Sequence, residues 1–486
     1  MSHETKALKG KIFVGLFWQY FQRIGSQAVS FIVSIILARL LSPSDFGTIA
    51  LISVFIVISN VFIDSGFSNA LIQRKEIDEI DTSSVFYTNI AISILLYLVI
   101  YSCSPAIAEF YNIPQLSSLL RVLSLQIILM ALCCVQNALL VRDMKFKINF
   151  YVNISAVIIS SSIGICCAYS GFGVWSLVYS QLAMQTVNVI GYWILVGWRP
   201  KIVFSFERIK KLFGYGSRIL CGALLNVIYS NAYNLIIGKK YSSVDLGFYN
   251  RGQIMPTIIV ENAANTINSV MFPALAKIQD DRAKFLSVVR RMMSAVAFIV
   301  FFIIALLFPL SYSIISLLLT DKWIPCVPYM QIVCITVCFT PFTLINSAIL
   351  TSLGDSRKYL RATMISRTFA ICLIAASSLV NIYFMVAMGS FAAMLSVFIM
   401  GFWNKQLINY SWKDFFCDIM PSFTLAIITS IIVFLVSRLG MSSLLTLIIG
   451  GVIGLIFYIS VAFLFKFNQM VSLKEILFNR KNTSKI

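Results

Sequence analysis

Long apolar segments alternate with short polar connections along the whole chain. Fourteen such segments can be counted among the 486 residues, and a helix that crosses a membrane needs about 20 mostly apolar residues. Charged residues make up 12% of the chain, about half of the share that is usual in a soluble domain. We therefore expect an all-α polytopic membrane protein with 14 transmembrane helices. The segments cover approximately residues 12–40, 46–72, 85–104, 119–141, 150–170, 172–196, 213–237, 246–275, 292–319, 327–353, 361–382, 384–407, 421–438 and 443–465.

The distribution of lysine and arginine predicts which side of the membrane each connection faces. If the N-terminus is cytoplasmic, the tails and connections on that side hold 28 of the 38 basic residues. Cytoplasmic connections of membrane proteins carry such an excess, so we expect both termini in the cytoplasm. The opposite side then holds the six residues Arg39, Arg121, Lys239, Lys240, Lys322 and Arg438.

A repeat of 200 residues divides the predicted bundle into two blocks of six helices. The stretch A-R-L-L-S-P-S-D-F-G at 38–47 aligns with G-K-K-Y-S-S-V-D-L-G at 238–247, and each stretch joins the first two helices of its block. Two lobes related by an internal repeat are a plan found among transporters. The coinciding residues are Ser42 with Ser242, Asp45 with Asp245 and Gly47 with Gly247.

The repeat also predicts how the chain is divided. In the first of the two turns, Pro43 ends one helix, and Ser44 or Asp45 can cap the next. The predicted parts are an N-lobe at 1–197, a cytoplasmic amphipathic linker on the membrane surface at 198–212, a C-lobe at 213–410, and two further helices with a basic cytoplasmic tail at 411–486.

Polar side chains recur at steps of three and four along the first two helices of each block, so they share one helical face. Arg23 lies near the middle of its segment, where an arginine facing lipid would cost at least about 2.5 kcal/mol. The simplest arrangement turns these faces toward one polar cavity between the lobes. The candidate substrate-binding residues are Arg23, Arg218, Gln19, Gln27, Asn226, Tyr233, Asn250, Gln253 and Asn265.

Two acidic residues on the same faces are candidates for coupling transport to an ion gradient. Glu261 lies near mid-depth among amide side chains, and Asp64 lies close to the cytoplasmic end of its helix. Ionisable residues inside a membrane usually mark a substrate or ion pathway. Ion pairs that only fix helix packing are the alternative, and Arg218 could instead extend to the cytoplasmic surface.

Motifs for metal binding, redox chemistry or hydrolysis are lacking in the sequence. The eleven cysteines lie mostly inside apolar segments, and none forms C-x-x-C, so we interpret them as small packing residues. There is no Walker loop, H-E-x-x-H or G-x-S-x-G. The longest connection on the non-cytoplasmic side, around 105–118, has Glu109 as its one acid, which argues against a membrane enzyme. We expect no resident cofactor, no metal site and no nucleic-acid partner.

Three stretches carry a resemblance to a known family. They are L-A-R-L-L-S-P-S-D-F-G-T-I-A-L at 37–51, D-S-G-F-S-N-A-L-I-Q-R-K at 64–75 and L-G-F-Y-N-R-G-Q at 246–253. The chain resembles the Wzx-type oligosaccharide flippases, and among them the colanic-acid-exporter-like branch. These flippases belong to the multidrug/oligosaccharidyl-lipid/polysaccharide exporter superfamily. Fourteen helices fit this branch better than the twelve that are usual in multidrug exporters.

The resemblance implies a bacterial inner-membrane protein that moves an undecaprenyl-pyrophosphate-linked oligosaccharide to the periplasmic leaflet by alternating access. It also implies two lobes in a V, a cationic cavity, coupling to an H⁺ or Na⁺ gradient, and a polysaccharide polymerase and chain-length proteins as partners. The chemistry agrees, because arginine suits phosphate groups and amides or hydroxyls suit sugars. Two alternatives stay open on the same fold: a multidrug or cation antiporter, and a flippase for the peptidoglycan lipid precursor.

Overall fold

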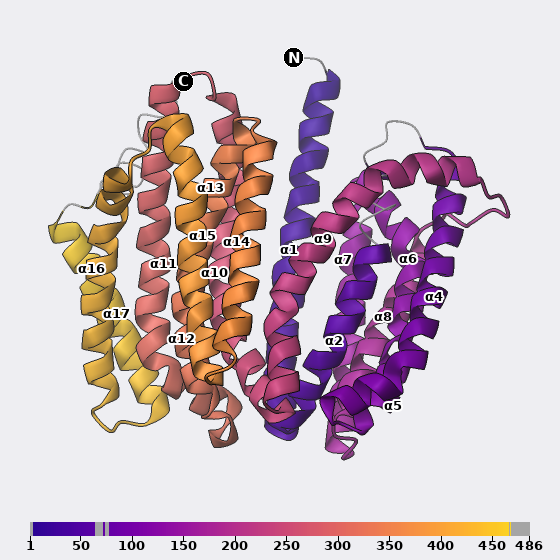
Figure 1. Ribbon diagram of the computed structural model, residues 1–486, viewed down its shortest axis with the longest axis horizontal. Helices are drawn as coiled ribbons and strands as arrows, with labels where there is room; N and C mark the ends of the chain where they lie inside the picture. Colours follow the sequence, from indigo (N-terminus) through magenta and orange to yellow (C-terminus); the bar gives the residue numbers. More distant parts are fainter. Residues whose placement is uncertain (1–2, 64–70, 73–76, 466, 468–486) are drawn as a thin grey trace. The chain divides into compact units, whose positions relative to one another are not determined.

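The computed structural model describes residues 3–63, 71–72, 77–465 and 467, and the regular elements in that part are helices (Figure 1). Eleven of the helices or helix pairs in this described part are long and apolar enough to cross a membrane. Three further long helices, α8 (Trp175–Leu195), α9 (Phe206–Lys240) and α10 (Ser243–Lys277), occupy the remaining predicted segments. The expected all-α polytopic class is therefore confirmed.

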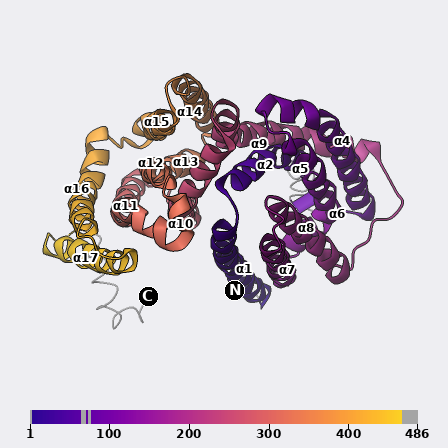
Figure 2. The ribbon, with the colours of Figure 1, turned by 90° about the horizontal axis from the view of Figure 1, so that it is seen from below.

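The chain forms two compact units, residues 1–247 and residues 248–486. In unit 1, α4, α6, α8, α7 and α1 pack in that order, each on the next, while α2 packs on α9; Figure 2 shows α1 beside α7. The division of the chain that the repeat predicts stays a prediction. Besides α8, α9 and the first turn of α10, unit 1 contains α1 (His3–Leu40), α2 (Pro43–Ile63), α4 (Glu79–Tyr111), α5 (Gln115–Leu123), α6 (Leu125–Arg142) and α7 (Phe146–Tyr169).

Unit 2 is built around α11 (Arg282–Leu319), which packs against α12, α16 and α17. The fourth span of each block is broken into two helices, at Ser124 in unit 1 and at Phe339 in unit 2. The break recurs at the same place in the block order, which supports the internal repeat. The other elements of unit 2 are the rest of α10, η2 (Asp321–Trp323), α12 (Cys326–Cys338), α13 (Thr340–Ser352), α14 (Ser356–Ser377), α15 (Ile382–Ile408), α16 (Trp412–Ser437) and α17 (Ser443–Leu464).

The two repeated turns begin their helices in the same way. The backbone amide of Asp45 donates to Ser42 Oγ (3.3 Å), and Asp45 Oδ2 accepts from the amide of Ser42 (2.9 Å). These two bonds satisfy amides at the start of α2 reciprocally, as in a capping box. Ser42 is therefore the cap, instead of Ser44 or Asp45, and Pro43 begins α2, where its missing N–H costs nothing. At the start of α10, the amide of Asp245 likewise donates to Ser242 Oγ (3.0 Å), and the Ser242 hydroxyl donates to Asp245 Oδ2 (2.7 Å), as the Ser42 hydroxyl does to Asp45 Oδ2 (2.7 Å).

The repeated glycines allow these two turns to pack backbone to backbone within unit 1. A Cβ atom on Gly47 would lie 1.7 Å from the carbonyl oxygen of Ser243, and one on Gly247 would lie 2.0 Å from that of Pro43. Because Gly47 and Pro43 correspond to Gly247 and Ser243 in the repeat, the contact is reciprocal. Glycine is required at both positions for this close approach.

We expect Gly47→Ala to destabilise the protein, because the Cβ would meet backbone that cannot rotate away. The loss should be about 1–3 kcal/mol, as for other overpacked sites. Gly451→Ala in α17 is the matched control: its Cβ meets nothing within 4 Å, so it should stabilise the helix slightly. Thermal unfolding in detergent micelles measures both. Equal unfolding temperatures for the two variants would contradict the tight contact.

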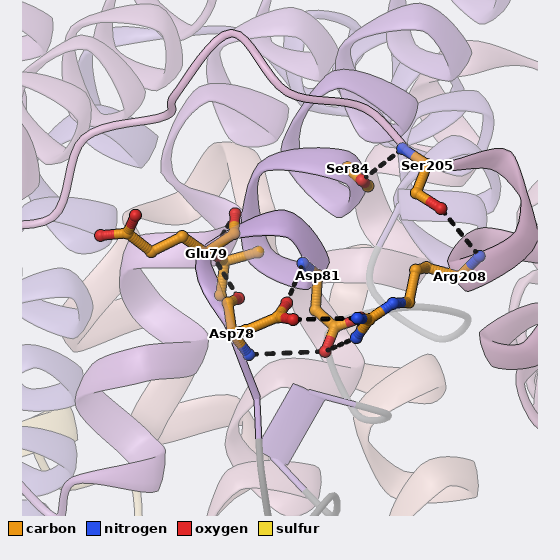
Figure 3. Close-up of polar contacts among 7 residues, drawn as sticks. Asp78, Glu79, Asp81, Ser84, Ser205 and Arg208 are labelled. Carbon is orange, nitrogen blue, oxygen red and sulfur yellow. Dashed lines mark hydrogen bonds and ion pairs between the residues drawn. The ribbon is translucent and has the colours of Figure 1, made fainter.

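The connection between α8 and α9 is fastened to the start of α4 (Figure 3). Arg208, in the first turn of α9, lies 3.1 Å from Asp78 and 3.2 Å from Asp81, whose side chain is 2% exposed. The pKa of Asp78 lies below its ordinary value, because it accepts a hydrogen bond from the Asp81 amide and faces Arg208. The amide of Ser205 also donates to Ser84 Oγ (3.0 Å). Helix α9 starts at Phe206, so residues 198–205 of the predicted amphipathic linker are non-helical and residues 206–212 belong to α9. The position of the linker on a membrane surface stays a prediction.

Unit 2 contains a second such cluster, with the charges exchanged. Here the arginine is Arg290 of α11, which is the third span of the second block. It lies 2.9 Å from Asp414 and 3.0 Å from Asp418 of α16. The Tyr410 hydroxyl also donates to Asp418 (3.0 Å). In each unit, the helix that follows the six-helix block is thus fastened to the third span of that block.

We expect Arg208→Ala to destabilise the protein by about 2–3 kcal/mol, because the buried Asp81 carboxylate would lose its ion pair with Arg208. Lys210→Ala removes an exposed positive charge from the same helix and should change stability by less than about 0.5 kcal/mol. Adding Asp81→Asn to Arg208→Ala should restore part of the loss in thermal unfolding. If the double variant were as unstable as Arg208→Ala alone, the buried charge would not be the cause.

Candidate functional site

A polar cavity of about 650 Å³ lies within unit 1, between α1, the end of α6, α7 and α8. Arg23 and Gln27 of α1 line it, as their shared helical face predicts. The neighbouring Gln22, Ser26 and Ser30 widen this polar stripe, because steps of three and four return to the same side of a helix. The remaining lining residues are Val141, Phe146, Asn149, Asn153, Val157 and Met184.

Aromatic packing holds α1 against α7 on one side of this cavity. The ring of Trp18 lies 5.2 Å from that of Phe150 and 6.1 Å from that of Tyr151, measured between centroids. Phe21 also contacts Phe150, at 5.4 Å. Aromatic pairs at such distances add to the stability from buried area. The contacts therefore fix the register in which the polar face of α1 meets α7.

Opposite Arg23, two asparagines one turn apart on α7 form a network with a tyrosine of α8. Asn153 Nδ2 donates to Asn149 Oδ1 (2.8 Å) and to the Tyr192 hydroxyl oxygen (3.2 Å). The Tyr192 hydroxyl in turn donates to Asn149 Oδ1. Tyr192 itself is 5% exposed, so the network is anchored in the packed interior and presents its amides to the cavity.

The lining gives the cavity a definite chemical character. Among the described residues that line it, Arg23 is charged and the others are amides, hydroxyls or apolar side chains. A guanidinium can meet phosphate or carboxylate oxygens with two parallel hydrogen bonds. Amides and hydroxyls both donate to and accept from sugar hydroxyls. The site therefore suits an anionic group attached to a hydroxyl-rich partner.

The other predicted residues with described side chains lie on α9 and α10 and do not line this cavity. Asn250 and Gln253 lie together on α10 in unit 2, where Gln253 Nε2 donates to Asn250 Oδ1 (3.0 Å). Glu261 is an exposed residue further along the same helix, and Asn226 is exposed on α9. Tyr233 is half-buried on α9. Their roles in one shared cavity stay predictions.

Four of the predicted residues lie partly or wholly outside the described part of the chain. Asp64 is outside it altogether, and of Gln19, Arg218 and Asn265 the structure gives only the helical backbone. Their assignment as binding or coupling residues stays a prediction.

The sequence analysis missed the α7 side of the site. Asn149 and Asn153 are spaced four apart at the start of an apolar segment, which is the signal that could have identified them. The prediction used the polar faces of the first two helices of each block, and α7 is the fifth span of its block.

Comparison with solved structures identifies the fold. The lipid II flippase MurJ in an inward closed conformation matches 94% of this chain and 100% of that chain with a TM-score of 0.77 at 16% identity. An inward-facing multidrug resistance MATE family transporter of the MOP superfamily matches 79% of this chain and 94% of that chain, with a TM-score of 0.58 at 17% identity. At these identities the likeness establishes the fold alone: that of a polytopic helical membrane protein.

The sequence comparisons identify the family. The family model described as "Polysaccharide biosynthesis protein" matches residues 36–328, more than half of the chain, and the chain belongs to this family. The resemblance to Wzx-type flippases of the MOP superfamily is thereby confirmed.

Named relatives come from several bacteria. The lipopolysaccharide biosynthesis protein WzxC of Escherichia coli (strain K12) is 24% identical over 335 residues, 68% of this chain and 67% of that protein. The teichuronic acid biosynthesis protein TuaB of Bacillus subtilis (strain 168) is 26% identical over 281 residues, 57% of this chain and 58% of that protein. The matches thus cover between a little over half and two thirds of these relatives.

Proposed function

We propose that this protein is a flippase that moves an undecaprenyl-pyrophosphate-linked oligosaccharide across the bacterial inner membrane for surface polysaccharide biosynthesis. The observation that carries the proposal is the cavity in unit 1, which Arg23 lines together with a set of amides and hydroxyls. The guanidinium would bind the pyrophosphate, and the amides of α7 would bind sugar hydroxyls. The isoprenoid tail, which is apolar, would stay in the lipid.

The proposed orientation follows from charge. Both termini are placed in the cytoplasm, because basic residues gather in the connections on that side. Substrate would enter from the cytoplasmic leaflet and leave toward the periplasm by alternating access. A polysaccharide polymerase and chain-length proteins would then take up the exported unit.

The character of the cavity also separates the alternatives. A cation antiporter needs acidic groups in its binding site, whereas the charged residue among the described lining of this cavity is an arginine. A peptidoglycan lipid-precursor flippase remains the second candidate, because its substrate has the same pyrophosphate and because the fold matches that of MurJ. The family match favours polysaccharide export between these two.

We expect Arg23→Ala to reduce export at least tenfold, because the pyrophosphate would lose its charged hydrogen-bond donor. Arg23→Lys should keep part of the activity, since lysine supplies the charge without the paired geometry. The measurement is surface polysaccharide in a flippase-null strain complemented with each variant at matched expression. Arg291→Ala, which removes an exposed arginine in unit 2, is the control and should complement fully. Full complementation by properly inserted Arg23→Ala would reject the anion-binding role.

We also propose that Glu261 couples transport to an H⁺ or Na⁺ gradient, because it is a carboxylate on a predicted spanning helix of unit 2. Glu261→Gln keeps the shape of the side chain and removes its charge, so export should fall and lose its dependence on the gradient. Glu109→Gln makes the same change at an exposed position at the end of α4 and should leave both unchanged. Transport into vesicles with an imposed pH or Na⁺ gradient measures the effect. Wild-type rate and gradient dependence in Glu261→Gln would leave Glu261 a structural residue.

A further inference from the structure

A second concave surface of unit 1 lies apart from the polar cavity and shares no lining residue with it. It is a groove of about 350 Å³ between α2, α4 and α9. Its side chains are almost entirely apolar, and it lies at the end of unit 1 that holds the α1–α2 and α9–α10 turns. The groove is lined mainly by Phe55, Cys103, Ala106, Ile107, Phe110 and Leu235.

The ammonium group of Lys239 lies beside this groove. Lys239 follows Leu235 by one helical turn on α9, and its Nζ lies 4.1 Å from the centre of the Phe110 ring. Nζ also donates to the backbone carbonyl of Phe110. A ring and a carbonyl attract a cation but carry no net charge, so these contacts leave the positive charge of Lys239 available to an anion. The exposed Lys240 follows it at the end of the helix.

The length of α4 places the groove at the boundary between acyl chains and headgroups. With 33 residues, α4 is about 50 Å long, whereas the hydrocarbon core is about 30 Å thick. The last turns of α4, which contain Cys103 to Phe110, therefore lie near the membrane surface. In the orientation proposed above, this surface is periplasmic, where basic residues are few.

We propose that this groove is an exit site that holds the isoprenoid diphosphate end of the exported lipid in the periplasmic leaflet. The first isoprene units lie against the apolar groove, and the diphosphate meets Lys239. The volume falls at the lower end of the range for ligand sites, about 300–1,000 Å³, so the groove takes the start of the chain and leaves the rest in lipid. The inference rests on the proposed flippase function.

The features of the site fit an isoprenoid diphosphate better than an ordinary phospholipid. An isoprenoid diphosphate has one hydrocarbon chain, which suits a single groove, whereas phosphatidylglycerol has two acyl chains. A diphosphate also carries more negative charge than a phosphodiester, which suits the adjacent Lys239.

The test is a titration of the full-length protein in detergent micelles with undecaprenyl diphosphate, followed by native mass spectrometry. All variants carry Arg23→Ala, so that the polar cavity does not contribute. Lys239→Ala should weaken binding at least fivefold by removing the cation. Ala106→Phe should weaken it as much by filling the groove from an exposed position on α4.

Two matched controls separate the groove from general effects. Arg438→Ala removes another cation that lies over a phenylalanine ring, 5.0 Å from the centre of Phe434 in unit 2. Ala91→Phe adds the same ring at an exposed position of α4 that does not line the groove. Both should bind undecaprenyl diphosphate like the Arg23→Ala parent.

The same series titrated with phosphatidylglycerol identifies the source of the phosphate. The proposal predicts that phosphatidylglycerol binds at least tenfold more weakly and does not displace undecaprenyl diphosphate. Equal binding and competition would make the groove a phospholipid site and overturn the assignment. Binding that is unchanged in Lys239→Ala and Ala106→Phe would also overturn it. Neither result touches the flippase function, which is tested separately by export in Arg23 variants.

Discussion

An arginine inside a membrane bundle needs polar surroundings, because leaving its charge against lipid costs several kcal/mol, and this constraint organises unit 1. The polar face of α1 turns toward Asn149 and Asn153 of α7. Tyr192 of α8 fixes those amides from the packed side, and Trp18 fixes the register of α1 on α7. A cavity that accepts anions thus follows from surrounding the exposed guanidinium of Arg23 with polar side chains.

The spacing of apolar residues was sufficient to predict the helices and the cavity face of α1, including Arg23 and Gln27. It could not predict which helix faces that stripe, because helical periodicity describes one element and contains no information about its neighbour. It also missed the break at Ser124, since the residues on both sides are apolar and belong to one hydropathy segment. The sequence analysis assigned the N-cap of α2 to Ser44 or Asp45 instead of Ser42. Ser42 and Ser44 are both chemically able to cap a helix, and only the backbone geometry decides between them.

The two ion clusters show a kind of symmetry that a residue-by-residue comparison of the two halves does not detect. Arginine lies on the following helix in unit 1 and on the third span in unit 2, with aspartates as partners in both. An ion pair stabilises equally when its charges are exchanged, so the interaction can persist while the residues at equivalent positions change type. The reciprocal turns behave differently: a backbone contact at Gly47 and Gly247 admits no other residue without movement, and their identity is therefore visible in the sequence repeat.

A carrier for a lipid-linked anion must bind strongly enough to desolvate the headgroup and weakly enough to release it. The two cationic sites of unit 1 suit these opposite demands. Arg23 lines the polar cavity among amides and hydroxyls, where a bidentate guanidinium can replace the water around a diphosphate. Lys239 is exposed at the end of its helix, where an ammonium is a point charge that water and salt screen readily. In the proposed pathway, weak binding at Lys239 lets the headgroup dissociate readily after it has left the stronger site, whereas the direction of net transport has to come from another source of free energy.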